Sequence, residues 1–152
     1  MKYSNTECQI PNTQRMPVLL FIILSICCTQ ADIWHQVRRG NYELVEKGNY
    51  PGTLKYMPHP AQYEGYVNRC RREIERNLDL LPIMTKQYFT ITQKLVYQYK
   101  FTWLDEDNQI LLLRYFAHIY NDSVFAGYQI LFVYDIRKNK IVKIFVSDVP
   151  LE

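Results

Sequence analysis

Hydrophobic residues follow three successive patterns along the chain: an unbroken run, a helical period and a strand period. The run covers residues 17–28 and contains no charge. Over residues 61–80 apolar side chains recur every three or four positions, which predicts one amphipathic helix ended by Leu81 and Pro82. The members of this stripe are Tyr63, Tyr66, Val67, Cys70, Ile74 and Leu78.

From Lys86 onward the period changes to two, which is typical of strands. Odd positions from Phe89 to Trp103 are apolar except Gln93, so 87–103 is either one long curved strand or two strands that join near Gln93. Further strands are predicted over 109–120, 124–136 and 141–147, and a short one over 42–46. The last strand should place Val142, Ile144 and Val146 on one face, opposite Lys143.

These elements predict an α+β fold in which one helix packs across a curved antiparallel meander sheet of four to five strands. Residues 32–60 form an N-terminal segment with the short strand, and residues 61–152 add the helix and the sheet to the same domain.

The first run is interpreted as part of a targeting sequence. A membrane span needs roughly 20 apolar residues, whereas the run 17–28 has the length of a secretory h-region and follows the positive charge of Arg15. We therefore expect residues 1–31 to be a signal peptide cut after Ala31, with no stable membrane span and a secreted, extracellular product. Translation from Met16 instead of the first methionine is an alternative.

Composition limits the classes of protein that remain. With 48% hydrophobic residues the chain can bury a core, and a net charge of +3 is too small to favour a nucleic-acid partner. After cleavage only Cys70 of the four cysteines remains, so an intrachain disulfide is excluded. We expect Cys70 to lie in the core. The alternative is a homodimer, formed through Cys70 or through swapping of the long 87–103 strand.

A glycosylation triplet, Asn-Asp-Ser, begins at Asn121 in a predicted turn.

No motif for catalysis is visible. The three histidines, His35, His59 and His118, are widely spaced, and the chain has neither a Cys-x-x-Cys pair nor a phosphate-binding glycine loop. We therefore expect no enzyme activity, no cofactor, no metal and no catalytic residue.

The layout of leader, short strand, helix and four antiparallel strands resembles the cystatin-like superfamily. In its inhibitory members an N-terminal glycine and a Gln-x-Val-x-Gly hairpin loop enter the cleft of papain-like proteases. Gly52 precedes the helix, and the loop position holds Gln93, Lys94, Leu95, Val96 and Tyr97. The resemblance implies a protein-binding function, as a degenerate protease inhibitor, because Leu95 stands at the valine and the glycine is absent.

An alternative resemblance is the cone-shaped fold of the nuclear-transport-factor-2-like superfamily, which wraps a curved sheet around helices and encloses a pocket. It implies a small apolar or aromatic ligand, and the chain is rich in tyrosine, with 13 residues. The side chains expected to line that pocket are Tyr97, Tyr99, Trp103, Tyr115 and Tyr128.

Overall fold

The computed structural model describes residues 32–52 and 61–149. The chain divides into two units, residues 1–31 and 32–152, and all described residues belong to the second. The predicted signal peptide lies outside the described residues.

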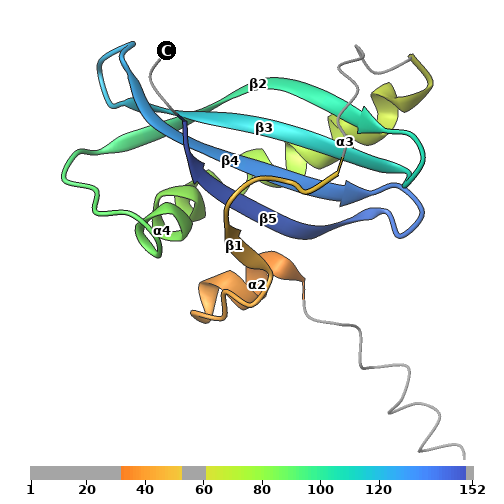
Figure 1. Ribbon diagram of the computed structural model, residues 1–152, viewed down its shortest axis with the longest axis horizontal. Coiled ribbons are helices and arrows are strands. Elements are labelled where there is room, and N and C mark those ends of the chain that lie inside the picture. Colours follow the sequence, from red (N-terminus) through yellow and green to blue (C-terminus); the bar gives the residue numbers. More distant parts are fainter. Residues whose placement is uncertain (1–31, 53–60, 150–152) are drawn as a thin grey trace, which may run out of the picture. The chain divides into compact units, whose positions relative to one another are not determined.

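The fold is α+β and is built on one five-stranded sheet (Figure 1). The strands are β1 (Val45–Lys47), β2 (Leu95–Asp105), β3 (Ile110–Ile119), β4 (Phe125–Asp135) and β5 (Lys140–Asp148), in the order β1-β5-β4-β3-β2. The last four form the expected antiparallel meander, but β1 pairs in parallel with β5, so the sheet is mixed. The alternation of side chains within a strand does not indicate which other strand it pairs with. The long connection from β1 to β5 permits their parallel pairing.

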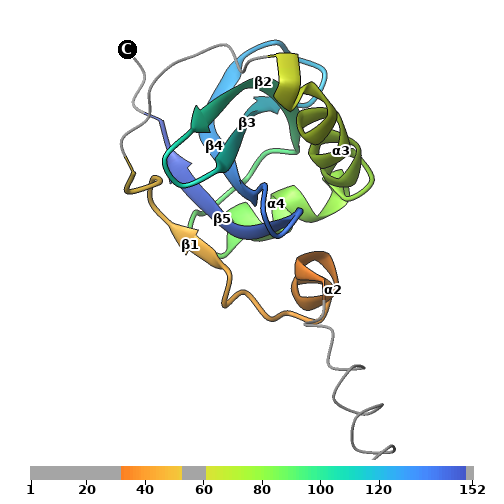
Figure 2. The ribbon, with the colours of Figure 1, turned by 90° about the vertical axis from the view of Figure 1, so that its right-hand side faces the viewer.

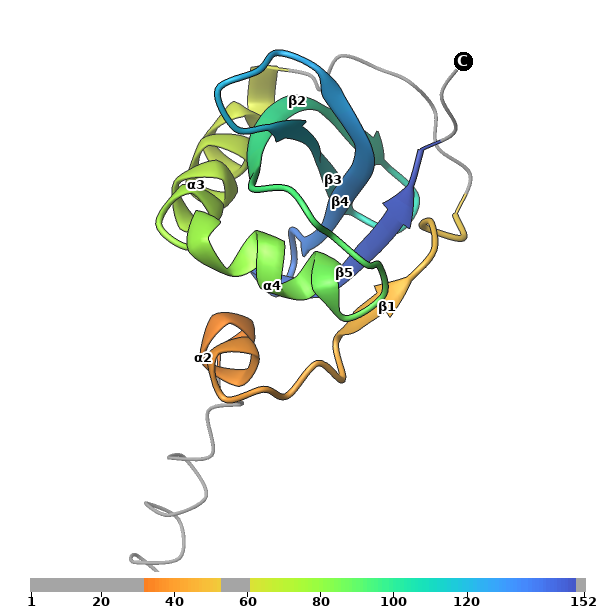
Figure 3. The same ribbon diagram turned by 90° about the vertical axis from the view of Figure 1, so that its left-hand side faces the viewer.

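The helices lie on one side of the curved sheet (Figures 2 and 3). They are α2 (Ile33–Arg38), η1 (Ala61–Tyr63), α3 (Glu64–Glu75), η2 (Leu78–Leu80) and α4 (Leu81–Lys86). The single helix expected over 61–80 is thus divided, and Leu81 and Pro82 begin α4 instead of ending a helix. Proline suits the first turn of a helix because its missing N–H has no intrahelical partner there.

Two other elements differ from expectation. Helix α2 was not predicted, because six residues are too few to show a period, although Ile33, Trp34 and Val37 are all buried. Strand β2 begins only at Leu95, and residues 90–94 form a loop despite their alternating pattern. The continuous strand over 87–103 is absent, so the structure offers no long strand for the expected swapping between two chains.

A bulge at Lys100 changes which side chains of β2 face the helices. Tyr99 pairs with Tyr115, but Phe101 pairs with the next residue along, Arg114. The extra residue reverses the parity of the strand. Phe101 and Trp103 therefore point to the opposite face from Tyr99, which corrects the assignment of all odd positions to one face.

A second bulge at Val142 has the same effect in β5. Val133 pairs with Lys143 and Tyr134 with Ile141, which leaves Val142 unpaired with β4. Ile141 is buried in the core in place of Val142, which packs on the other face.

The face that packs against the helices, here called the inner face, holds the main core. Tyr115, Phe132 and Ile144 of the sheet are almost fully buried, with Val67, Cys70 and Ile74 of α3 in the same cluster. Burial, and to a smaller extent the charge of Glu73, raises the pKa of the Cys70 thiol well above its usual value. The expectation of a core cysteine is confirmed, and a thiol with no exposed surface cannot reach a second chain.

Candidate functional site on the outer sheet face

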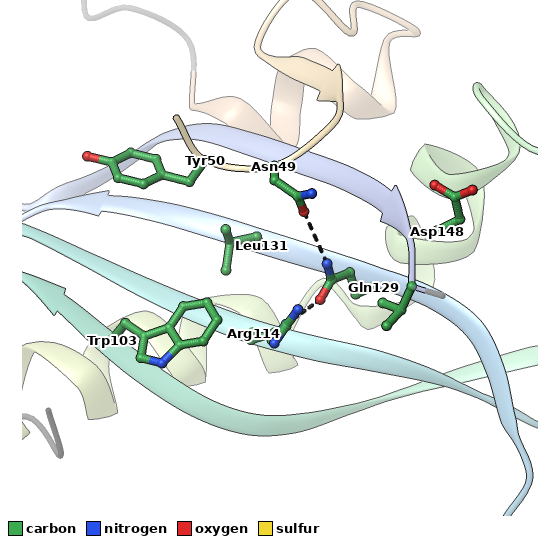
Figure 4. Close-up of a pocket in the computed structure, with 8 residues that line it drawn as sticks. Asn49, Tyr50, Trp103, Arg114, Gln129, Leu131 and Asp148 are labelled. Atoms are coloured by element: carbon green, nitrogen blue, oxygen red, sulfur yellow. Dashed lines mark hydrogen bonds between the residues drawn. The ribbon is translucent and has the colours of Figure 1, made fainter. Parts of the chain in front are cut away.

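The opposite face of the sheet, here called the outer face, carries a smaller apolar cluster beside a cavity. The cluster contains Ile110, Leu112, Leu131, Val133 and Phe145, with Trp103 and Tyr50 packed against it. The cavity has a volume of about 230 Å³ (Figure 4). Its lining includes Asn49, Tyr50, Trp103, Arg114, Gln129 and Leu131.

One wall of the cavity comes from the segment that follows β1. Gly48 adopts a φ of 133°, which favours glycine, and the chain then places Asn49 and Tyr50 over the outer face. The Tyr50 ring meets Phe145 edge-on at 6.4 Å between centroids, and its hydroxyl donates to Asp105 Oδ2 at 2.9 Å. Since Phe145 belongs to β5 and Asp105 to β2, Tyr50 links the outer face across several strands.

Arg114 occupies the centre of the site. It projects from β3, and its guanidinium carbon lies 5.3, 5.0 and 4.9 Å from the ring centroids of Phe101, Trp103 and Phe116. Each ring face attracts the cation. The Lys100 bulge is what brings Phe101 and Trp103 to this side of the sheet, so the aromatic surround depends on it.

A line of hydrogen bonds fixes the orientation of Arg114 (Figure 4). Arg114 Nε donates to Gln129 Oε1, and the amide nitrogen of Gln129 donates to Ser147 Oγ at 2.8 Å and to Asn49 Oδ1 at 3.2 Å. Ser147 Oγ in turn donates to Asn49 Oδ1 at 3.1 Å. Because the Gln129 amide is satisfied at both ends, its oxygen must face Arg114.

The charge of Arg114 has no counter-ion among the described residues. Asp148 lies at the rim of the cavity with its carboxylate directed away from Arg114, and no ion pair joins them (Figure 4). Burial lowers the pKa of the Arg114 guanidinium, yet an arginine remains charged at neutral pH. The site therefore holds a half-buried cation whose Nη groups have no acceptor in the described part of the chain.

Asp105 anchors the Tyr50 side of the site. Burial opposes the charged carboxylate, but hydrogen bonds from Asn108 and Tyr50 outweigh it and lower the Asp105 pKa. Burial first, and then the bond to Asp105 and its charge, raise the pKa of Tyr50 to about 12. The Tyr50–Asp105 contact is therefore a neutral phenol donating to a carboxylate at neutral pH.

The residues expected to enter a protease cleft are not brought together. Tyr50 contacts Asp105 at the end of β2, whereas Gln93 and Lys94 precede Leu95, the first residue of that strand. Its 11 residues separate the two places by roughly 30 Å. Gly52 follows Tyr50 by two residues and can lie at most about 7 Å from it. Of the predicted loop, Val96 is exposed and Leu95 is buried.

The five residues expected to line one pocket on the inner face lie on both faces of the sheet. Trp103 lies on the outer face, because the bulge at Lys100 reverses the orientation of the β2 residues that follow it. The tyrosines remain inside: Tyr97 bonds to Thr85 Oγ1, Tyr99 meets Tyr115 at 5.6 Å and Tyr128 meets Phe89 at 5.1 Å. Each of these tyrosines contacts neighbouring side chains of the domain. Burial raises the pKa of Tyr97 to about 12.

Two further predicted positions lie at one end of the sheet. Asn121 is exposed in the turn after β3, with a left-handed φ of 61°, so its glycosylation stays a prediction. His118 is half-buried beside Phe125, and its Nε2 has no partner in the described part of the chain.

Within the described ranges no three His, Cys, Asp or Glu side chains gather to hold a metal ion, and no helix is long and apolar enough to cross a membrane. Comparison of the chain with protein-family models, curated proteins and solved structures finds no match.

Sequence reasoning missed Arg114 and Gln129 as site residues. The signal that could have found them is the occurrence of two polar side chains on one face of strands that are otherwise apolar. Asn49 and Ser147 carry no such signal, because only the fold brings them to Gln129.

Proposed function

We propose that the domain is a non-catalytic binding domain and that its outer face receives a carboxylate of a partner molecule at Arg114. The observation that carries this proposal is a half-buried guanidinium with no counter-ion among the described residues. Removing a cation from water without pairing it is costly. A ligand carboxylate would remove that cost through two parallel N–H···O bonds.

The walls of the cavity favour a carboxylate attached to a flat apolar group. Tyr50 and Trp103 both line it, and Leu131 forms part of its floor. Aromatic and apolar walls with one placed charge are typical of small-ligand and side-chain pockets. A volume of about 230 Å³ admits a group the size of one amino-acid side chain with its carboxylate.

Calorimetric titration with a matched pair of ligands tests the proposal on the full chain. We expect N-acetylphenylalanine to bind and N-acetylphenylalanine amide to bind at least about tenfold more weakly, because a hydrogen bond to a charged group contributes about 1.5–3 kcal/mol. Equal affinity for both ligands, or binding of neither at millimolar concentration, would contradict the proposal.

Two variants assign the binding to this site. Arg114→Gln should remove the preference for the carboxylate, because the amide has no charge. Arg72→Gln removes an exposed arginine of α3 that lies outside the cavity and should leave the affinity unchanged. An Arg114→Gln variant that still discriminates between the two ligands would place the binding elsewhere.

The proposed protease inhibitor is a narrower version of the same function. The separation of Gly52 from Gln93–Tyr97 along β2 does not support a single wedge made of both. Titration against a papain-like protease tests this version, and absence of inhibition at micromolar concentration would exclude it. A ligand pocket between sheet and helices is less supported than the outer site, since Tyr97, Tyr99, Tyr115 and Tyr128 contact one another, Phe89 or Thr85.

The proposed setting of this function is extracellular, after removal of residues 1–31. The support is the uncharged run 17–28 behind Arg15. Expression of the full chain in a secreting host should release a product that begins at Asp32, as read by mass spectrometry. An uncleaved chain retained in the cell would contradict secretion.

A further inference from the structure

A second cavity lies between the start of α3 and the turn that joins β4 to β5. Its volume is about 410 Å³, and no acidic residue of the described ranges lines it. Its lining includes Gln62, Gly65, Tyr66, Arg69, Arg137 and Asn139. None of these residues belongs to the Arg114 site, so the cavity is a separate feature.

Both arginines of this cavity are held by neutral oxygen atoms. Arg69 Nη1 donates to Asn139 Oδ1 at 2.6 Å, and Arg137 Nη2 donates to the carbonyl of Asn108 at 3.2 Å. Neither guanidinium forms an ion pair with a described residue. Two exposed arginines therefore line this cavity, each without a carboxylate partner among the described residues and with N–H donors left for a ligand.

The position of Arg69 is defined by a further contact. Asn139 has a left-handed φ of 54° in the β4–β5 turn, and its Oδ1 also accepts the Tyr134 hydroxyl at 2.5 Å. The Asn139 oxygen is thus held from two sides, and it orients the guanidinium of Arg69 relative to the cavity. Preorientation of this kind reduces the entropy lost when a ligand binds.

Gly65 forms an exposed part of the cavity wall. It occupies the second position of α3, where glycine is less favourable than alanine, and a Cβ built there would have no atom within 4 Å. The space beside Gly65 is therefore open to solvent. A longer side chain at this position would enter the cavity without a clash.

We propose that this cavity binds a phosphate group, either as inorganic phosphate or as a phosphate ester. Two guanidinium groups match the double charge of phosphate, and the planar fork of arginine fits its oxygen atoms bidentately. The ring of Tyr66 and the open side of the cavity leave room for the organic part of an ester.

Calorimetric titration of the full chain with inorganic phosphate, phenyl phosphate and phenol tests this site, since none of the three carries the carboxylate that the Arg114 site would bind. Binding of either phosphate compound without binding of phenol is the expected result. Binding of phenyl phosphate alone would identify the ester as the ligand, and binding of inorganic phosphate at equal affinity would show that the phosphate group suffices. Absence of binding by both phosphate compounds at millimolar concentration would overturn the proposal.

Substitutions separate this site from the Arg114 site. Arg69→Gln and Arg137→Gln should each weaken phosphate binding by about tenfold or more. Gly65→Glu should abolish it by placing a carboxylate in the cavity, whereas Gly65→Ala should preserve it and shows that the helix tolerates a side chain. Arg114→Gln and Arg72→Gln should leave it unchanged. Phosphate binding that persists in both Arg69→Gln and Gly65→Glu would overturn the assignment.

Discussion

The two faces of the sheet are built from the same alternating strands but differ in the polar groups that they hold. On the inner face, the hydroxyls of Tyr97 and Tyr134 find partners within the domain, Thr85 and Asn139, while the buried hydroxyl of Tyr115 has none among the described residues. On the outer face, Arg114 is oriented by Gln129 but keeps its charge without a counter-ion among the described residues. A satisfied polar group stabilises the fold, whereas an unpaired charge that is firmly oriented is available to a ligand.

The comparison also shows how one strand serves both faces. Before the bulge, β2 directs Tyr97 and Tyr99 inward, and after it the strand directs Phe101 and Trp103 outward. Because of the single extra residue Lys100, strand β2 contributes aromatic rings both to the core and to the Arg114 site.

Deletion of Lys100 is the strongest way to break this arrangement. Without the extra residue, Phe101 and Trp103 would have to turn inward or β2 would have to shift along β3. We expect destabilisation by at least about 4 kcal/mol, the range reached only by changes that disrupt a core. Chemical denaturation measures it.

The control for this deletion is Lys100→Ala, which keeps the bulge and removes only an exposed side chain. It should change stability by at most about 0.5 kcal/mol. Equal stabilities of the deletion and the substitution would show that the bulge does not assign side chains to faces.

A matched pair of phenylalanines compares the two faces directly. Phe132 is fully buried on the inner face, and Phe116 is half-buried on the outer face beside Arg114. Phe132→Ala should cost about 3–5 kcal/mol, and Phe116→Ala should cost less because its site is already partly open to water. Phe116→Ala should also weaken N-acetylphenylalanine binding, as measured by calorimetry. A larger stability loss at Phe116 than at Phe132 would show that the outer face, not the inner face, holds the main core.

Acid should loosen the outer face before the inner core. The Asp105 pKa is lowered in the folded protein, so its stabilising contacts with Asn108 and Tyr50 are present above its unfolded value of about 3.9 and are lost as pH falls through the folded value. Asp135, whose pKa is also lowered, acts in the same direction. We expect ligand affinity to fall as the pH drops through the folded Asp105 value. Asp105→Asn should weaken binding already at neutral pH, and a variant with unchanged affinity there would contradict this role of Asp105.

Arg114→Met should have a small effect on stability. The apolar side chain removes the cost of a half-buried charge with no counter-ion among the described residues, but it leaves the buried Gln129 Oε1 without its donor, so we expect the two effects to offset each other to within about 1 kcal/mol. Thermal denaturation checks this, and carboxylate binding should be lost in the same variant. A loss of several kcal/mol would mean that Arg114 is structural.

Much of the fold follows from local patterns. Period-two alternation correctly predicts three strands of the meander, because a half-buried strand must alternate. The apolar stripe correctly places Val67, Cys70 and Ile74 of α3 in the core.

The remainder depends on contacts between distant residues. The bulges at Lys100 and Val142 and the parallel pairing of β1 with β5 arise from how strands meet, which no local pattern records. The site could be predicted only in part for the same reason. Arg114 is visible as a polar residue in an apolar strand, but Asn49 reaches Gln129 across 80 positions of sequence.

The chain offers one tryptophan on each face, which permits a direct test of the central claim that the outer face binds a carboxylate. Trp34 packs against Phe132 in the inner core, and Trp103 lies beside Arg114. Their indole N–H signals can be followed separately by NMR during titration with N-acetylphenylalanine. We expect the Trp103 signal to shift and saturate while the Trp34 signal stays in place. A shift of Trp34 alone, or no shift of Trp103 at millimolar ligand, would contradict it.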